Sequence, residues 1–503
     1  EVVEIVSPGM NVSEKFLEQN KNNFICSLFY DRYGIGISIL DYSTGEFYSN
    51  IIDQKDVDNV ISKYDISELI LIENQKKLFK NFRSLNHLYT NTIPDWINDL
   101  DFNTEILCNH FNVKSLKGFG LKDKNSSVIS SGMLLYYLKE NFTSNSLHID
   151  NIKSLSYTNS MQLDYYTIKN LELFESLLNN NKKKGTFISS IDKTITSSGS
   201  RLLKKWITNP LIDKTLIDER LDLVEEFKND FDFIEKTRTE LKKTYDIERI
   251  ISKISCSKAN PSDIINLADS LEFLNQFKLM LSKDKVFLLS LIESISDTKG
   301  LIKTITKTLK KEPSISIKKG NFIKDGFSKE LDLLRKISND ANDWMIEYQT
   351  KLKNETNISS LKIKFNKIFG YYIDVTKIHS NKVPDNFIKK QTLVNNERYF
   401  TQELKEFEHK ILNAEHEISS LENDIFQKLC NEIMHYISKI QNNCSIISKI
   451  DIFSSFAFIS VKNNYTRPEI TQNYNIEIKN GRHPVIEEMF MNENQFISND
   501  TFL

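Results

Sequence analysis

Lysine side chains are concentrated between residues 361 and 400. This stretch has eight basic and three acidic residues, a balance of +5, whereas the whole chain of 503 residues carries a formal charge of −2. Leu361, Ile363 and Phe365 alternate with two lysines, so a strand would turn the apolar side chains inward and the lysines outward. Ammonium groups held in this way bind phosphates and give salt-dependent affinity without reading a base sequence. The stretch is therefore a candidate nucleic-acid interface.

A partner strand is expected after a turn at 366–370, with Tyr371, Ile373 and Val375 on its inner face. In a lysine-rich chain an ordinary solvated surface is the alternative interpretation, and the position of the stretch between two long helices favours binding. The candidate phosphate-binding residues are Lys362, Lys364, Lys367, Lys389 and Lys390, with Thr392 and Asn395 as hydrogen-bonding partners.

The other reactive residue types form no catalytic or metal-binding pattern in the sequence. The five cysteines are scattered, which is typical of buried reduced thiols. His409 and His416 lie two helical turns apart, too far to share an ion, and for His483 a structural role is favoured. Asp31 and Asp41 flank a strand, but a metal-dependent nuclease needs several convergent carboxylates. We predict no catalytic residue and no metal site.

Two long helices must position the basic stretch. Apolar residues recur every three or four positions over about 326–358 and 402–441, the pattern of a two-helix coiled coil. At ~1.5 Å per residue the second helix would be roughly 60 Å long. The predicted seams are Phe327, Leu331, Leu334, Ile337, Ala341, Trp344, Tyr348 and Leu352 on the first helix, and Leu404, Phe407, Ile411, Ala414, Ile418, Leu421 and Ile425 on the second.

The preceding sequence divides into a β-rich start and a helical middle. Residues 1–122 predict an α/β domain of the ribonuclease-H type, and residues 123–325 predict a helical core that contains an amphipathic helix at Ser130–Asn141. The expected strands are 2–6, 24–30, 34–41, 46–49 after a turn at 42–45, and a buried parallel strand at 66–72.

The segment Gly185–Asp213 is the densest part of the predicted core. Ile188, Ile191 and Ile195 are expected on one face of a helix, and Ser197-Ser198-Gly199 permits a close turn or a tight helix contact. A solvated face is the favoured interpretation for the basic residues of the next helix, which are Arg201, Lys204 and Lys205.

Several segments resemble the MutS family of DNA mismatch-repair proteins. They occur in the family's order along the full length of the chain. Residues 1–9 are similar to the opening of its connector domain, 161–173, 185–213 and 246–263 to its core, 369–373 and 390–399 to its clamp, and 481–485 and 496–500 to the entry into its ATPase domain.

The resemblance implies a mainly α, multidomain chain that is a piece of a longer protein. A small β-rich clamp is inserted at the tip of long coiled-coil lever helices. The implied divisions are a ribonuclease-H-like connector at 1–122, a helical core at 123–325, a first lever helix at 326–358, a DNA clamp at 359–401, a second lever helix and return to the core at 402–474, and a truncated start of the ATPase domain at 475–503.

The resemblance also implies ligands. Lys390 and Asn395 match clamp residues at phosphates, with Lys389 beside them, while Val394 stands where we expect a lysine in bacterial members. Phe496 would stack on the adenine of ATP, with the backbone of Ile497 beside the base. No G-x-x-x-x-G-K-[ST] occurs in this sequence, so ATP and Mg²⁺ are expected in the longer parent and not on this chain alone.

The partners implied by the family are double-stranded DNA, a MutS-type dimer partner (a second copy in bacteria) and a downstream repair factor of MutL type on the connector. The expected location is cytoplasmic and nucleoid-associated in a bacterium, and nuclear or organellar otherwise. No apolar run reaches about 18 residues, so no membrane is expected. The family's mismatch-reading Phe-x-Glu is not expected in this chain, because Glu46 precedes Phe47.

Three alternatives stay open. A structural coiled-coil protein without a DNA role would share the helix seams, but the pattern lasts few heptads and is interrupted by strands. A nuclease would need a carboxylate cluster in the N-terminal domain. A relative that lacks mismatch recognition, of the meiotic type, would share the connector, core and clamp.

Overall fold

The computed structural model describes residues 7–12, 16–121, 124–141, 147–155, 160–177, 185–314, 317, 320–366, 370–490 and 496–503. The expected strand at 2–6 lies outside these residues. The chain forms two compact units. The first unit comprises residues 1–259, 266–302 and 433–503, and the second unit comprises residues 260–265 and 303–432.

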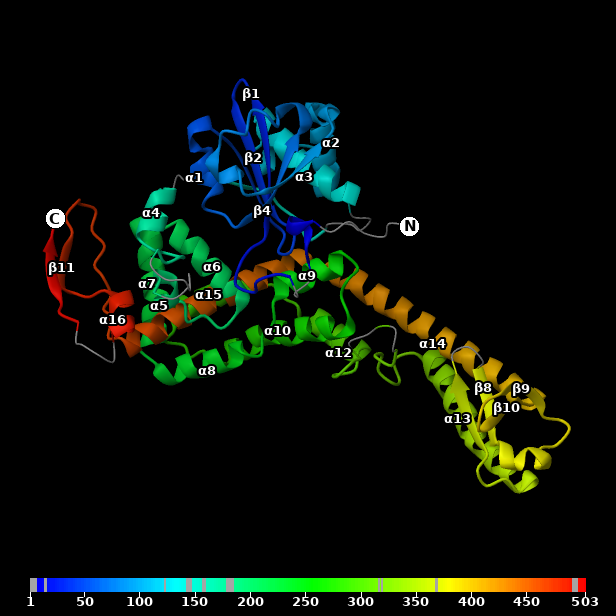
Figure 1. The fold of residues 1–503 in the computed structure, drawn as a ribbon. Helices are drawn as coiled ribbons and strands as arrows, with labels where there is room; N and C mark the ends of the chain where they lie inside the picture. Colours follow the sequence, from blue (N-terminus) through cyan, green and yellow to red (C-terminus); the bar gives the residue numbers. More distant parts are fainter. Residues whose placement is uncertain are drawn as a thin grey trace. The chain divides into compact units, whose positions relative to one another are not determined.

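The first unit begins with a six-stranded sheet in the order β5-β4-β1-β2-β3-β6 (Figure 1). An antiparallel meander, β1 to β3, is flanked by the parallel strands β4 and β5 on one side and β6 on the other. The predicted meander and the buried parallel strand at 66–72 are confirmed. The strands are β1 (Phe24–Asp31), β2 (Gly34–Asp41), β3 (Glu46–Ile52), β4 (Ile66–Ile72), β5 (Tyr89–Ile93) and β6 (Lys153–Ser154).

Helices cover both faces of this sheet, and each face has its own apolar core. α1 (Val57–Ile61) contributes to one core, and α2 (Leu100–Phe111) and α3 (Asn125–Asn141) contribute to the other. α3 and β6 thus lie with the sheet, although the sequence placed residues from 123 onward in the helical core. A mixed sheet with helices on both faces makes this part of the chain an α/β domain.

Buried serines join α3 to the sheet. Ser130 Oγ lies 2.7 Å from Ser38 Oγ of β2, and Ser127 Oγ lies 2.6 Å from Ser49 Oγ of β3. A hydroxyl both donates and accepts, so these groups satisfy one another away from water. The predicted helix at 130–141 is confirmed, but it is not amphipathic, because most of its residues are buried. The helix begins at Asn125, and its polar serines face the sheet because small hydroxyls permit close packing.

A buried histidine between α3 and β6 packs against the β2–β3 turn. His148 Nε2 donates to the Tyr42 carbonyl at 2.8 Å, and its ring packs edge-on against the Tyr42 ring. Gly45 in this turn has a φ of +81°, and a Cβ there would lie 2.5 Å from the His148 carbonyl oxygen, so the turn requires glycine. Burial lowers the pKa of His148 to about 4.

We expect His148 to destabilise the protein in acid. Its pKa is lower in the folded protein than the ordinary value of about 6.5, so its contribution is complete above that pH and is lost as the pH falls towards 4, by about 3 kcal/mol. His148→Gln, whose amide still donates to Tyr42, should flatten this part of the pH dependence of the free energy of unfolding. Urea titrations at successive pH values would measure it, and identical pH profiles for both proteins would contradict the assignment.

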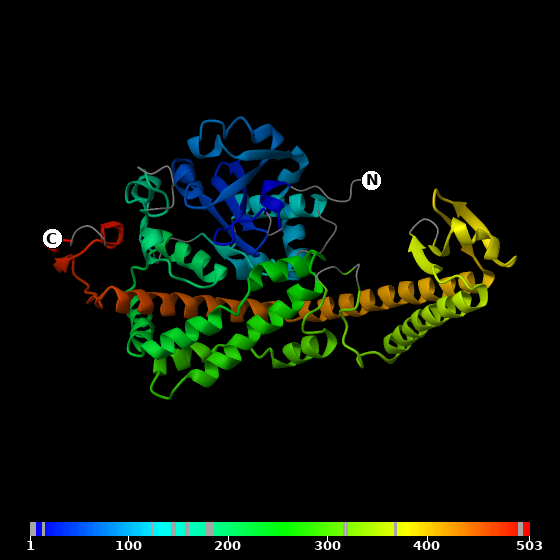
Figure 2. The ribbon, with the colours of Figure 1, turned by 60° about the horizontal axis from the view of Figure 1, so that its bottom comes forward.

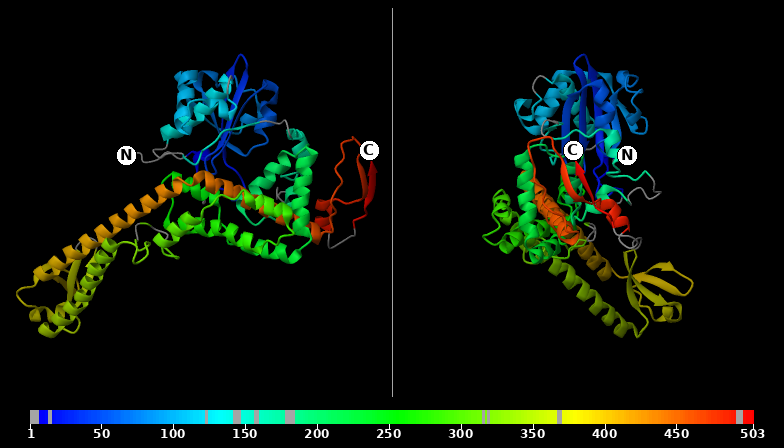
Figure 3. Two further views of the ribbon diagram at one scale, coloured as in Figure 1. Left: turned by 180° about the vertical axis from the view of Figure 1, so that it is seen from behind. Right: turned by 90° about the vertical axis from the view of Figure 1, so that its left-hand side faces the viewer.

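The remainder of the first unit is helical and surrounds α15 (Ile437–Lys462), which packs against α6, α7, α8 and α9 (Figures 1 and 3). α15 is long and apolar enough to cross a membrane, but 67% of its apolar window is buried inside the protein. It is therefore a core helix. The other helices up to residue 308 are α4 (Tyr165–Asn170), α5 (Phe187–Ile191), α6 (Ser197–Thr208), α7 (Lys214–Lys228), α8 (Phe231–Leu241), α9 (Ile247–Ser255), α10 (Pro261–Met280), α11 (Val286–Glu293) and α12 (Lys299–Thr308).

The loop between α5 and α6 is held by a buried carboxylate of α15. The backbone N–H groups of Ile195 and Thr196 donate to Asp451 at 2.9 and 2.7 Å. A Cβ on Gly199 would lie 2.4 Å from Asp451 Oδ2, which confirms the predicted close contact at this glycine. Ile195 lies in the loop, because α5 ends at Ile191, so its predicted place on a helix face is wrong.

Arg201 of α6 is buried, contrary to the predicted solvated face. Its two terminal nitrogens contact Asp246 at 2.8 and 2.7 Å, and one of them also contacts Glu248 at 2.7 Å. The neighbouring lysines are engaged as well: Lys204 Nζ donates to the Asn20 carbonyl at 2.6 Å, and Lys205 Nζ lies 3.3 Å from Glu46 Oε1. Acidic residues that are distant in sequence thus hold Arg201 in an internal ion-pair network, while the two lysines are half-buried.

The second unit consists mainly of two long helices and a four-stranded sheet at one end of them (Figure 2). The rings of Trp344 and Phe407 stack face to face between the helices, and the Tyr348 ring stacks on Trp344. α14 ends at Met434, earlier than the predicted end at 441. The elements are α13 (Lys329–Thr356), β7 (Lys362–Asn366), β8 (Gly370–Thr376), the 3-10 helix η8 (Lys377–Lys382), β9 (Ile388–Thr392), β10 (Asn396–Phe400) and α14 (Gln402–Met434).

The predicted seam holds near the sheet and at Leu331, close to the start of α13, but not between them. Residues of both helices near the sheet are buried as expected, namely Tyr348, Leu352, Leu404, Ile411 and Ala414. Farther along, Ile337 is exposed and Ser338 is buried in its place, and α14 buries Glu422 and Phe426 instead of Leu421 and Ile425. Phe327 precedes α13, and the side chain of Ala341 lies outside the described residues. A helix of 3.6 residues per turn drifts away from a strict heptad, and here the drift is not absorbed by supercoiling.

The connection before α13 is fastened to both helices where the seam shifts. Glu422, which is buried, accepts from the Asn321 N–H at 2.7 Å and pairs with Arg335 of α13 at 2.5 Å. Arg335 also donates to the Ile323 carbonyl at 2.9 Å. The Phe322 ring packs edge-on against Phe426. We call Arg335, Glu422 and residues 320–326 the bracket.

Candidate nucleic-acid interface

The four-stranded sheet of the second unit has an inner and an outer face. Its order is β7-β8-β10-β9, with antiparallel neighbours. The inner face packs on α13 and α14 through Ile373, Val375 and Tyr399. Because side chains alternate along a strand, the residues between these point away from the helices. The register places Lys362 opposite Asp374, and Asp374 opposite Arg398, on this outer face.

The outer face is basic, but a carboxylate of the same sheet neutralises part of its positive charge. Lys364 Nζ lies 2.7 Å from Asp374 Oδ2, and this hydrogen bond raises the pKa of Lys364. Arg398 lies over the Tyr372 ring at 4.4 Å from its centroid. One carboxylate therefore faces three cations, Lys362, Lys364 and Arg398, which leaves a positive surface that can attract phosphate.

Lys389 and Lys390 lie on the edge strand β9 at a β-bulge. Arg398 pairs with Gln391 and Tyr399 pairs with Lys389, so Lys390 is the extra residue between them. Lys389 forms an ion pair with Glu397, which together with a hydrogen bond from Tyr399 lowers the pKa of Glu397. The two consecutive lysines therefore have different surroundings.

Lys390 reaches a small hollow between the sheet and α14. Its ammonium group lies 5.4 Å from the centroid of the Phe400 ring. The hollow of about 130 Å³ is lined by Tyr371, Lys390, Phe400, Lys405 and Glu408. Lys405 adds a cation that the sequence analysis did not select, because it lies on the helix and not in the basic stretch.

Asn395 is exposed in the turn between β9 and β10. Its carbonyl accepts from the Lys377 N–H at 3.0 Å, which holds the start of η8 beside this turn. The Leu393 N–H donates to the Asn396 carbonyl at 2.8 Å and closes the turn. The side chain of Asn395 thus lies next to the basic edge strand.

The structure brings the sequence-selected residues together on one small sheet but not on one face. Lys362 and Lys364 lie on the outer face, Lys389 and Lys390 on the edge strand, and Asn395 in the adjoining turn, while Lys367 lies outside the described residues. Phe365 was predicted to point inward, yet it is 51% exposed because β7 is an edge strand. The sequence missed Arg398 and Tyr372 as a cation–aromatic pair.

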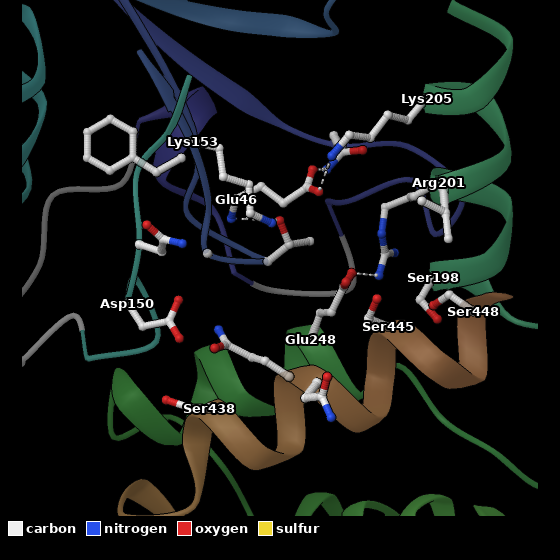
Figure 4. A pocket seen from close by; sticks show the side chains of 18 residues that line it. Glu46, Asp150, Lys153, Ser198, Arg201, Lys205, Glu248, Ser438, Ser445 and Ser448 are labelled. Carbon is white, nitrogen blue, oxygen red and sulfur yellow. Dashed lines mark hydrogen bonds and ion pairs between the residues drawn. The ribbon is translucent and has the colours of Figure 1, made fainter. Parts of the chain in front are cut away.

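A hollow in the first unit offers a second candidate (Figure 4). It has a volume of about 360 Å³ and is lined by groups from the sheet, α6, α9 and α15. Its charges are largely matched: Lys205 pairs with Glu46, and Arg201 pairs with Glu248. Such a hollow has little net charge to attract a polyanion, so the sheet of the second unit is the better nucleic-acid site.

The N-terminal carboxylates are used within the fold. Asp41 accepts from the Ser43 N–H and Oγ, both at 2.8 Å, and from Asn22 at 2.8 Å. Asp31 accepts from the Tyr33 N–H at 2.7 Å. Within the described part of the chain, no group of three or more potential ligand residues could hold a metal ion. Those residues thus give no support to the nuclease alternative.

The C-terminal elements are α16 (Pro484–Phe490) and the antiparallel pair β11 (Glu477–Gly481) and β12 (Asn499–Phe502). His483 precedes α16, and its Nδ1 accepts from the Ile486 N–H at 3.4 Å, in keeping with a structural role. Phe496 is half-buried and Ile497 is exposed, just before β12.

Two known family domains match this chain: MutS domain II over residues 23–150 and MutS domain III over residues 166–457. DNA mismatch repair protein MutS from Flavobacterium psychrophilum is 37% identical over 503 residues, which are 100% of this chain and 58% of that protein. The protein of the same name from Flavobacterium johnsoniae is 38% identical over 504 residues (100% and 58%), and that from Lachnoclostridium phytofermentans is 37% identical over 508 residues (100% and 54%). The chain spans a little over half the length of these relatives.

Proposed function

The chain belongs to the MutS family of DNA mismatch repair proteins, and we propose that the sheet of its second unit grips duplex DNA by the phosphates. The observation that carries the proposal is the basic outer face and edge of a sheet inserted between two long helices. Phosphate contacts of this kind position a protein on a duplex without reading its sequence. We accordingly assign α13 and α14 as lever helices and β7 to β10 as the clamp.

The proposed site residues are Lys362, Lys364, Lys389, Lys390 and Asn395, with Arg398 added from the structure. Lys364 and Lys389 carry internal carboxylate partners, so a phosphate exchanges places with Asp374 or Glu397. Charge-assisted hydrogen bonds are the strong ones, and phosphate offers several acceptor oxygens to each ammonium group. This exchange supports binding by several weak contacts.

The test is the salt dependence of duplex binding by Lys389→Ala/Lys390→Ala. Each lost phosphate contact lowers the slope of log K against log salt by about 0.9, so we expect a slope reduced by about 1.8 and affinity roughly 10- to 50-fold weaker near 0.1 M salt. The loss should be equal on matched and mismatched duplexes. Fluorescence anisotropy titrations of the labelled duplex would measure it.

The matched control is Lys77→Ala/Lys80→Ala, which removes two exposed lysines from the α/β domain of the first unit. We expect it to leave both slope and affinity close to those of the unaltered chain. An unchanged slope for the Lys389/Lys390 variant, or a loss confined to mismatched DNA, would refute the proposed role of the sheet.

For the longer protein we propose an ATP- and Mg²⁺-dependent ATPase whose first part is reached at residues 475–503, with Phe496 and Ile497 beside adenine. A flat apolar ring beside a base supports this assignment of Phe496. The α/β domain, including α3, is proposed as the connector and as the dock for a MutL-type factor. We further propose assembly with a second MutS-type subunit and a cytoplasmic, nucleoid-associated location, in keeping with the bacterial relatives.

A further inference from the structure

Two apolar side chains stand out at the end of the sheet in the second unit. Ile378 of η8 is 89% exposed, and Val394 of the β9–β10 turn is 86% exposed. They are the two most exposed large apolar residues among those the structure describes in this unit. The backbone hydrogen bond from Lys377 to Asn395, the residues next to them in sequence, holds η8 and the turn together. We call Ile378 and Val394 the apolar tips.

The surroundings of the apolar tips are basic. Lys377 and Lys382 of η8 are exposed, and β9, which leads into the turn, carries Lys389 and Lys390. The only acidic residue between η8 and β9 is Asp385. A surface of this charge is complementary to a polyanion. Two exposed apolar side chains within it fit a polyanion that has apolar C–H surface between its charges.

Duplex DNA has that chemistry, since its deoxyribose rings present C–H edges between successive phosphates. We propose that Ile378 and Val394 make apolar contact with the deoxyribose edges of the duplex whose phosphates the neighbouring lysines hold. The inference rests on the proposed function of the sheet and adds apolar contacts to the ionic contacts with phosphate. It gives Val394, where the family resemblance led us to expect a lysine, a contact that does not depend on charge.

The test uses the whole chain with Ile378→Ser/Val394→Ser. Both side chains are solvated in the free protein, so the thermal unfolding curve should stay unchanged. Loss of two partly buried apolar contacts should weaken duplex binding about tenfold. The loss should be the same at every salt concentration, because apolar contact releases no counterions, and the slope of log K against log salt should not change.

A second measurement separates sugar contact from any indirect effect. RNA carries a 2′-hydroxyl where DNA carries hydrogen, so an RNA duplex of the same sequence offers a more polar sugar edge. The unaltered chain should prefer the DNA duplex, and the double variant should lose that preference by about the same tenfold factor. The matched control is Leu333→Ser/Ile346→Ser, which removes two exposed apolar residues of α13 and should change neither affinity nor preference.

The outcomes are distinguishable. Unchanged DNA affinity of the tip variant, with normal binding by the unaltered chain, would overturn this inference alone. A reduced salt slope in the tip variant would also overturn it, because the effect would then come from displaced lysines. Failure of the unaltered chain to bind duplex DNA at all would overturn the proposed function itself.

Discussion

Replacing Arg201 with leucine is expected to lower the free energy of unfolding by about 3–5 kcal/mol, because removal of one partner leaves buried charge uncompensated. Arg201 is 5% exposed and contacts Asp246, Glu248 and the Gln19 carbonyl. Burial would raise the pKa of Asp246, but Arg201 outweighs it and the pKa falls below its usual value. Without the Arg201 guanidinium, Glu248 loses its ion pair, and Asp246 keeps only Arg249, whose Nε lies 3.7 Å away.

Urea unfolding followed by the fluorescence of Trp206, on the same helix, would measure this loss. Arg467→Leu is the matched control: its guanidinium faces three carboxylates, Asp218, Asp222 and Glu225, but the side chain is 35% exposed. Solvent screening limits such a pair to about 1 kcal/mol or less. If both variants lose equally little, Arg201 is not the internal anchor that its contacts indicate.

The second large effect is expected in the bracket. Arg335→Met leaves Glu422, a fully buried carboxylate, with the Asn321 N–H but without a cation. We expect a loss of about 3–5 kcal/mol within the second unit for the same physical reason. It should appear as faster amide hydrogen exchange in 320–337 and in the middle of α14.

A double variant makes this prediction specific. Arg335→Met/Glu422→Gln removes both charges but keeps an oxygen that can accept from Asn321. We expect it to recover more than half of the loss, since replacing both members of a buried pair is far less costly than replacing one. A double variant as unstable as the single one would show that shape at this site, and not charge, stabilises the unit.

The sequence predicted those elements whose side-chain pattern repeats locally. β1, β2, β3 and β4 were placed within a few residues because their apolar residues alternate or run continuously between turns. The helices α13 and α14 were found for the same reason. Each of these patterns lies within one segment and can be recognised without knowing what that segment packs against.

Features that depend on distant partners were not predicted. Arg201 was predicted to be solvated because its partners, Asp246 and Glu248, are distant in sequence. The serines of α3 are buried although they are polar, because Ser38 and Ser49 of the sheet satisfy them. The seam shift at Glu422 requires knowledge that residues 320–326 fold back between the helices.

The candidate site was predicted in composition but not in electrostatics. The basic stretch was found by counting charge, and the counting was correct. It could not reveal that Asp374, which lies opposite Lys362, forms its ion pair with Lys364, or that Lys389 pairs with Glu397 while Lys390 lines a hollow. Pairing of this kind is decided by which strands become neighbours, which local sequence does not specify.

The carboxylates beside Lys364 and Lys389 have a kinetic consequence if the sheet holds DNA as proposed. Each of these lysines has an intramolecular anion, Asp374 or Glu397, to which it returns as soon as a phosphate departs. Dissociation of a phosphate therefore does not leave the ammonium group without an anion, and the activation barrier to dissociation is lowered. Each such contact therefore dissociates readily, while several of them together keep the protein bound. Binding of this kind permits movement along the duplex one phosphate at a time.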